Sequence, residues 1–451
     1  MGPEELGYSP EVLAVVAVAG TLLLVFRPRL LLPLAWAAIL TVDNTAYTFT
    51  RVGSGFFLVN LFDVLLILGL LAGLRLSDSA TRIRLLRIPI VLGMLLVVGL
   101  SLTFLQRDLI YEDLRLLRFA AFFPVAWAIG ALGTRGSSAM RVFLWILVSA
   151  VAFQSLRQCI YVIAFADPAA TEASWRTLRF FNAGLVYVPI IVLVTADRLP
   201  SWQRLSLIVS TALAAVALVL TQTRSLWIPQ AVVIAGLLIW RLPRGRIAGP
   251  LLLGALAVGA VVLGGRLFSD VTESRVDLWA LFTEGHAMDL SDGTGREAAI
   301  AAEMAAWQEG NWVLGRGLGF HNGAGYDQGL AWGHNGYTSY LANLGFIGFV
   351  AYGLVVPGVV VRWGRVLIRG LEPTGRTLGV LALATVGFCC IQSVFSSGLL
   401  AGHVYSMYGL LAGVAVASGQ RAKLAAQSRP PRSTVYIPRP EPRPTRAPRL
   451  I

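Results

Sequence analysis

Two arginines and a histidine stand at the ends of apolar segments, where polar chemistry can meet a membrane surface. Arg224 ends one apolar run, Arg296 begins a helical stretch, and His334 opens another apolar run. A guanidinium group binds two phosphate oxygens at once (bidentate binding) and stays charged at any relevant pH. Both arginines are therefore candidates for binding an anionic group. An imidazole titrates near about pH 6.5 and can take a proton from a hydroxyl. The structural alternatives are headgroup contacts or a surface ion pair for the arginines, and a hydrogen-bonding role for the histidine.

Two further charges fall inside apolar runs. Asp63 and Arg157 are each surrounded in sequence by aliphatic residues. A charge within a membrane is costly, and it indicates either a functional site or an ion pair. Two interpretations are therefore open: the two residues pair with each other, or they serve the site, with Arg157 as a substrate-binding residue.

Signatures of nucleotide and metal sites are missing from the sequence. It has no phosphate-binding loop with a lysine and no dinucleotide fingerprint after a strand, and Gly315-x-Gly-x-Gly lies in a loop. The cysteines (Cys159, Cys389 and Cys390) lie in apolar runs without metal-ligand spacing. We expect a site without cofactor or metal.

Composition indicates the elements that must position these residues. Of 451 residues, 56% are hydrophobic and 14% charged, against about 25% charged in soluble domains. The mean hydropathy is +0.70, and many apolar runs approach the roughly 20 residues that span a bilayer. We predict an all-α polytopic membrane protein with about 12–14 transmembrane helices. The expected spans are 10–26, 28–42, 56–74, 88–105, 119–132, 142–166, 180–196, 205–222, 225–240, 247–264, 337–361, 377–396 and 399–418.

Arginines mark alternate connections between these spans. The positive-inside rule then places the N-terminus outside and the C-terminus in the cytoplasm, and we expect an inner-membrane (plasma-membrane) protein. One connection is an exception, because it would carry Arg107, Arg115 and Arg118 outside, beside acidic residues. The Pro- and Arg-rich tail, residues 419–451, is expected to be disordered and cytoplasmic. In a membrane protein, the net charge of +13 indicates first which loops face the cytoplasm. We therefore expect membrane lipids as partners and no nucleic acid.

One long connection, residues 265–336, separates the N-terminal helices (1–264) from the C-terminal ones (337–418). It carries ten acidic residues and four arginines, and the topology places it outside. Long loops in compact proteins are usually functional. Helical spacing of Ile300, Met304 and Trp307 predicts a helix from Gly295 to Trp307. We therefore expect an extracytoplasmic catalytic loop that contains short helices.

The ordered motifs of residues 205–361 resemble the O-antigen ligase and O-antigen polymerase superfamily of bacterial membrane glycosyltransferases. The resemblance rests on Thr221-Gln-Thr-Arg-Ser, on Arg296 with Trp307, on Asn311-Trp-Val-Leu-Gly-Arg-Gly-Leu-Gly, and on His334-Asn-Gly-Tyr with Leu341, Leu344 and Gly345. The N-terminal half is similar in hydropathy, and Arg179-Phe-Phe-Asn182 is similar to an Asn-containing segment of many members. The loop is short for the superfamily.

The resemblance implies the membrane C-type glycosyltransferase architecture and an inverting, metal-independent transfer. The donor would be an undecaprenyl-pyrophosphate-linked glycan, and the acceptor a glycan or a lipid-anchored sugar, as in lipopolysaccharide or polysaccharide assembly. His334, Arg296 and Arg224 would be catalytic, since charge stabilisation is the main need when pyrophosphate leaves. Substrate binding is assigned to the remaining candidates, Arg157, Arg179, Asn182, Arg316 and Asn335.

Other functions remain open at this stage. A peptidoglycan glycosyltransferase would share the donor, but its acidic loop motif is not visible in the sequence. A transporter or flippase of lipid-linked glycans would carry several charges in mid-membrane, often in repeated halves. A membrane scaffold without catalytic activity is the third alternative. The sequence does not separate a ligase from a polymerase, because nothing in it defines the acceptor.

Overall fold

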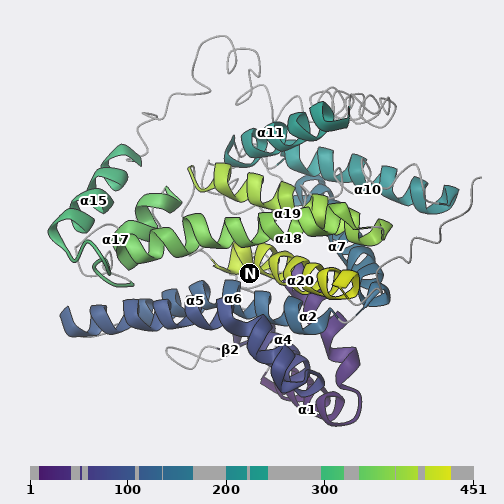
Figure 1. Cartoon of the computed structure of the whole chain (residues 1–451), viewed down its shortest axis with the longest axis horizontal. Coiled ribbons are helices and arrows are strands. Elements are labelled where there is room, and N and C mark those ends of the chain that lie inside the picture. The colour runs from purple at the N-terminus through teal and green to yellow at the C-terminus, as the bar shows by residue number, and fades with distance from the viewer. Residues whose placement is uncertain are drawn as a thin grey trace, which may run out of the picture.

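The computed structural model is a bundle of helices (Figure 1). It describes residues 10–41, 51–52, 59–106, 111–134, 136–165, 200–220, 224–241, 296–318, 335–370, 372–394 and 402–427. The N-terminal helices are α1 (Pro10–Phe26), α2 (Pro28–Thr41), α4 (Leu61–Leu76), α5 (Ser79–Gln106), α6 (Tyr111–Gly133), α7 (Ser137–Phe165), α10 (Ser201–Leu220) and α11 (Arg224–Arg241). The later helices are α15 (Arg296–Glu309), α17 (Gly336–Gly348), the π-helix η7 (Phe349–Val355), α18 (Val356–Arg369), α19 (Pro373–Gln392) and α20 (Gly402–Gln427).

Five helical segments are long and apolar enough to cross a membrane: Ser79–Gln106, Leu116–Gly133, Ser137–Arg157, Gly336–Arg369 and Pro373–Gln392. Each coincides with a predicted span. The other predicted spans coincide with helices too, except 180–196 and 247–264, which lie outside the described residues. The most apolar segment, α5, leaves large side chains such as Met94, Val97 and Leu105 exposed. An apolar surface of this kind suits lipid, so the chain is a helical membrane protein.

The centre of the bundle is α20, which lies against α6. Glycines permit this close approach: a Cβ at Gly409 would lie 2.3 Å from the Phe123 carbonyl oxygen, and one at Gly413 would lie 2.1 Å from that of Trp127. Small residues four apart are the usual means of close helix packing in membranes. On the other side of the contact, a Cβ at Gly130 would lie 2.3 Å from the Leu410 carbonyl oxygen. The two backbones therefore touch along this seam.

Several predicted boundaries differ from the observed ones, and three of the differences have a clear reason. The span predicted to begin at 56 begins as α4 at Leu61, because Arg51–Val52 and Val59–Asn60 pair as a short antiparallel ribbon, β1 and β2. α5 begins at Ser79, nine residues before the predicted span, since its arginine-rich first turns are also helical. Residues 419–427, predicted to be disordered, are the last turns of α20. Gly419 packs on Trp363 there, and good helix formers such as Ala422 and Leu424 follow.

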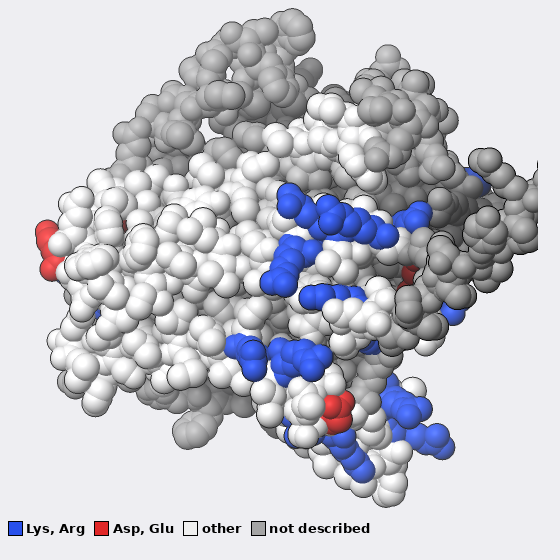
Figure 2. Space-filling model, in the orientation of Figure 1, with Lys and Arg blue, Asp and Glu red and all other residues white. Residues whose placement is uncertain are grey.

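The arginines at the helix ends gather in one belt on the face shown in Figure 2. We name this group the basic belt: it follows the end of α4, the start of α5, the end of α18 and the start of α19. Arg75 of α4 donates to the carbonyl of Val25 at the end of α1 over 2.9 Å, so α1 and α4 also end together. α15 and the start of α17 lie at the opposite end of the molecule (Figure 1). The basic belt residues are Arg75, Arg82, Arg84, Arg87, Arg362, Arg365, Arg369 and Arg376.

Candidate functional site

The loop helix α15 is seated on the first turn of α17 by a buried carboxylate. Glu303 has 0% of its surface exposed, and its Oε1 accepts a hydrogen bond of 2.6 Å from Ser339 Oγ. Its Oε2 accepts a second hydrogen bond from Thr338 Oγ1. Both hydroxyls belong to the N-terminal turn of α17, where the helix dipole also favours a negative charge. Glu303 therefore joins α15 to α17 through two residues that lie 35 and 36 positions later in the sequence.

Asn335 caps this same turn. Its Oδ1 accepts from the backbone N–H of Tyr337 (2.9 Å) and of Thr338 (3.4 Å), which satisfies two of the donors that a helix start leaves without an intrahelical partner. The Gly336 N–H donates to the Ser393 carbonyl over 2.6 Å, just beyond the end of α19. Asn335, which we predicted to bind substrate, thus has a structural role as an N-cap in the described residues. It directly follows His334, which lies outside them.

The motif from Asn311 to Gly317 docks into a break in α17. The break is at Gly345, whose φ is +65° and ψ −162°. On the N-terminal side of the break, the carbonyls of Ala342 and Asn343 accept from the N–H groups of residues 316 (2.8 Å) and 317 (3.1 Å). On the C-terminal side, the N–H groups of residues 346 and 347 donate to the carbonyls of residues 312 (2.9 Å) and 313 (3.2 Å). An unbroken helix would pair these four groups in two hydrogen bonds, from residue 346 to 342 and from 347 to 343, and four hydrogen bonds to the loop take their place.

Glycine is required at this junction. A Cβ at Gly345 would lie 2.3 Å from the Val313 carbonyl oxygen, and one at Gly315 (φ +74°) would lie 2.6 Å from the Gly345 nitrogen. Gly317 (φ +97°) faces α5 in the same way, with a Cβ only 2.5 Å from Thr103 Oγ1. Positive φ values are cheap only for glycine. The Gly-x-Gly run of the loop is therefore a docking motif, a role that its sequence did not indicate.

The docked segment is also tied to α5. The Leu318 N–H donates to the Gly99 carbonyl over 3.0 Å, and Thr103 Oγ1 donates to the Leu318 carbonyl over 2.5 Å. Leu318 itself is 3% exposed. Residues 296–318 are thus fixed to two candidate membrane-spanning segments, α5 and α17, by hydrogen bonds and by burial.

Arg316 points to the surface of this segment. Its guanidinium donates to Glu309 over 2.9 Å, and the side chains are 36% and 68% exposed. An ion pair with this much exposure contributes little to stability, about 0–1 kcal/mol. Beside it, Trp307 Nε1 donates to the Trp312 carbonyl over 2.9 Å. The substrate-binding role predicted for Arg316 is compatible with a surface position and stays a prediction.

The other candidates are distributed as follows. Arg296 is the first residue of α15 and Arg224 is the first residue of α11. Arg157 lies in α7 and is half-buried. Arg179 and Asn182, like His334, lie outside the described residues. The described residues contain no group of three or more His, Cys, Asp or Glu that could hold a metal ion.

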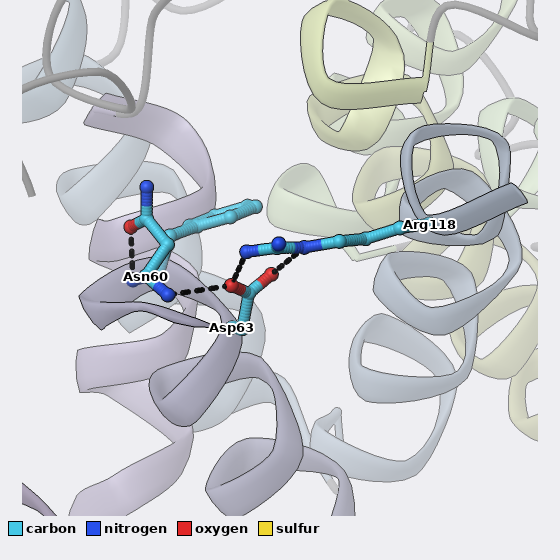
Figure 3. Close-up of polar contacts among 4 residues, drawn as sticks. Asn60, Asp63 and Arg118 are labelled. Atoms are coloured by element: carbon cyan, nitrogen blue, oxygen red, sulfur yellow. Dashed lines mark hydrogen bonds and ion pairs between the residues drawn. The ribbon is translucent and has the colours of Figure 1, made fainter. Parts of the chain in front are cut away.

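Asp63 pairs with Arg118 (Figure 3). The Arg118 guanidinium donates to both carboxylate oxygens, over 3.1 Å from Nε to Oδ1 and through a second contact from Nη2 to Oδ2. The Asn60 N–H also donates to Oδ2 over 2.9 Å, as part of a capping box at the start of α4. The suggested pair of Asp63 with Arg157 is therefore replaced by Asp63 with Arg118. One arginine of the connection that broke the positive-inside pattern is thus neutralised by an acid.

Glu303 is the residue that the sequence reasoning missed. The signal was available, because Ile300, Met304 and Trp307 predict one apolar face of α15, and Glu303 falls within that face. An acid in an apolar stripe indicates a buried, partnered carboxylate. Its partners, Thr338 and Ser339, belong to another element, and the sequence did not identify them.

Comparison of the sequence with models of known protein families and with curated protein sequences gave no match.

Proposed function

We propose that this protein is a glycosyltransferase of a bacterial inner membrane. It moves a glycan from undecaprenyl pyrophosphate to an acceptor sugar hydroxyl, as members of the O-antigen ligase and polymerase superfamily do. The observation that carries the proposal is the seating of α15 on the first turn of α17 through Glu303. This contact joins the helix that begins at Arg296 to the helix that follows His334. Arg296 and the helix that follows His334 in the sequence therefore belong to elements that are fixed to each other.

The packing of α11 supports a location of Arg224, the third proposed catalytic residue, at the end of the molecule where α17 begins. α11 lies along α19, where a Cβ at Gly387 would be 3.6 Å from Val233 Cγ2. In the predicted alternating topology these two helices are antiparallel, so the start of α11 lies beside the end of α19. Ser393, at that end, accepts a hydrogen bond from Gly336, two residues after His334.

The proposed reaction needs few groups. His334 takes the proton of the acceptor hydroxyl, and the acceptor oxygen forms a bond to the anomeric carbon of the donor. The bond from that carbon to the pyrophosphate oxygen breaks, and undecaprenyl pyrophosphate leaves with the bonding electrons. Arg224 and Arg296 hold the pyrophosphate, whose negative charge increases as the bond breaks. The configuration at the anomeric carbon is inverted, as the resemblance implies, and no metal takes part.

The proposed orientation follows from the basic belt. Arginines are concentrated on the cytoplasmic side of membrane proteins, and α15 with the start of α17 lies at the end away from the basic belt (Figures 1 and 2). The loop of residues 265–336 is therefore extracytoplasmic, with the N-terminus outside and the C-terminus inside. The complete chain would have about 12–14 spans.

The test uses the purified protein in nanodiscs, the native undecaprenyl-pyrophosphate-linked repeat unit, and EDTA instead of added metal. A ladder from the donor alone identifies a polymerase, and a product only with a separate acceptor identifies a ligase. We expect Arg224→Ala or Arg296→Ala to lower kcat by about 10²–10³-fold, and His334→Ala by about 10²–10⁴-fold. Arg84→Ala, an exposed arginine of the basic belt, is the matched control and should keep full activity.

Two results would contradict the proposal. Full activity of the three variants at normal protein level would refute the site. No product with any acceptor, beside an active native membrane extract, would refute the glycosyltransferase and favour transport of the lipid-linked glycan. That alternative is measured directly, as movement of a labelled donor between the leaflets of proteoliposomes.

A further inference from the structure

We propose that Glu303 is a positioning residue of the site, which fixes the distance between the pyrophosphate-binding start of α15 and the proton-accepting start of α17. This inference rests on the proposed function. Its structural basis is a fully buried carboxylate that holds hydroxyls of two consecutive residues, Thr338 and Ser339. In this role Glu303 acts through the two elements that it joins.

The geometry suits a positioning role. Glu303 lies seven residues after Arg296, which is two helical turns or about 10 Å along α15. Thr338 lies in the first turn of α17, four residues after His334 in the sequence. Because this contact lies near the start of both helices, a small displacement of α15 at Glu303 changes the separation between Arg296 and the first turn of α17 by a similar distance.

Among the contacts of the described residues, this one lies near the start of α15. A second anchor of the described loop, residues 312–317 in the break at Gly345, lies beyond the C-terminal end of α15. This docked segment fixes the C-terminal end of α15, but it leaves the N-terminal end of that helix free to swing. Ser339 is 3% exposed, so water does not readily replace a lost partner there. The two hydrogen bonds of Glu303 join the middle of α15 directly to α17, closer to Arg296 than the docked loop does.

The kinetics of Glu303→Ala should therefore distinguish a positioning role of Glu303 from a role in folding alone. A variant that only unfolds part of the enzyme loses active molecules, which lowers the apparent kcat and leaves KM for the donor unchanged. A displaced Arg296 instead weakens the hold on pyrophosphate. Because a misplacement of about 1 Å can cost about 10²-fold, we expect Glu303→Ala to raise KM for the donor about 10-fold and lower kcat about 10-fold or more.

Glu303→Gln should restore most of the activity. Its amide oxygen can accept from one hydroxyl and its N–H can donate to the other, so both contacts are kept without the charge. For Glu303→Gln we expect KM within about threefold of the wild-type value, since geometry rather than charge carries the role. Thr338→Val combined with Ser339→Ala should reproduce Glu303→Ala, and adding Glu303→Ala to that pair should cause little further loss. Gln308→Ala, an exposed position on the same helix, is the control.

Hydrogen exchange measured by mass spectrometry supplies a readout that does not depend on activity. Glu303→Ala should speed exchange of α15 and of the first turn of α17, with α6 and α20 unchanged. Unchanged exchange in α15, or a lower apparent kcat with an unchanged KM, would overturn the positioning role. An inactive wild-type protein would instead overturn the proposed function and with it the kinetic role, while exchange would still decide whether Glu303 fixes α15.

Discussion

The half-buried carboxylate of Asp63 and the fully buried one of Glu303 show how single charges are accommodated in this bundle. Each lies beside the first turn of a helix, where the dipole favours negative charge. Asp63 lies within α4 and closes a capping box with Asn60, whereas Glu303 reaches the first turn of α17 from α15. Asp63 additionally receives the guanidinium of Arg118 on α6. A carboxylate in these positions therefore has two effects. It accepts hydrogen bonds from groups in the first turn of a helix, and it joins that helix to a second element.

Asp63→Asn should weaken the contact between α4 and α6. The substitution removes the charge that faces Arg118, whose side chain is only 26% exposed. The loss of one partner of a largely buried charged hydrogen bond costs about 1–3 kcal/mol in the free energy of unfolding. The measurement is reversible unfolding in mixed detergent micelles. The control is the double variant with Arg118→Gln: it should be less destabilised than the sum of the two single variants, and strict additivity would contradict the pair.

At the scale of elements, the sequence specifies the helices better than their connections. Apolar runs predicted α15 to within two residues of its ends and α17 to within one of its start. The break at Gly345 was not predictable in this way, because the groups that satisfy it come from residues 312–317, about thirty positions earlier. Glu303 and Asp63 have the same property. The sequence pattern places both acids among apolar neighbours. Their partners, however, follow only from the packing of segments that are distant in sequence.

Gly345→Ala should release the docked loop segment. The new Cβ would lie 2.3 Å from the Val313 carbonyl oxygen, and φ at this position is +65°. With ψ at −162°, this is a backbone region that is essentially restricted to glycine, and a residue with a Cβ pays about 1–3 kcal/mol to adopt it. Each displaced hydrogen bond costs about 1 kcal/mol more. We expect a lower unfolding temperature and faster hydrogen exchange over residues 311–318.

Gly358→Ala in α18 is the matched control for this substitution. A Cβ there would meet nothing within 4 Å, and alanine in a helix interior is favoured over glycine by about 1 kcal/mol. The control should therefore be neutral or slightly stabilised. Equal effects of the two substitutions would show that the loop segment does not depend on the break in α17.

At the scale of the whole molecule, two features define its polarity. The basic belt occupies the ends of α4 and α18 and the starts of α5 and α19 (Figure 2). α15 and the docked segment lie at the opposite end (Figure 1). Between them, the central seam of α20 and α6 brings backbones into contact through Gly409, Gly413 and Gly130. A bundle held in this way presents two chemically different ends, which is the arrangement that a membrane enzyme with its site on one side requires.

This polarity predicts which ends of the chain face which compartment. The native cysteines (Cys159, Cys389 and Cys390) are first replaced by alanine, and a single cysteine is then placed at Gln308 on α15 or at Gln427 at the end of α20. Both positions are exposed. In intact spheroplasts, a membrane-impermeant maleimide should label Gln308→Cys and not Gln427→Cys, because positively charged helix ends are retained in the cytoplasm. Permeabilisation should make Gln427→Cys reactive and leave the labelling of Gln308→Cys unchanged, which controls for exposure. The reverse pattern would place Arg296 and the start of α17 in the cytoplasm, where a transfer at the outer surface of the membrane is impossible.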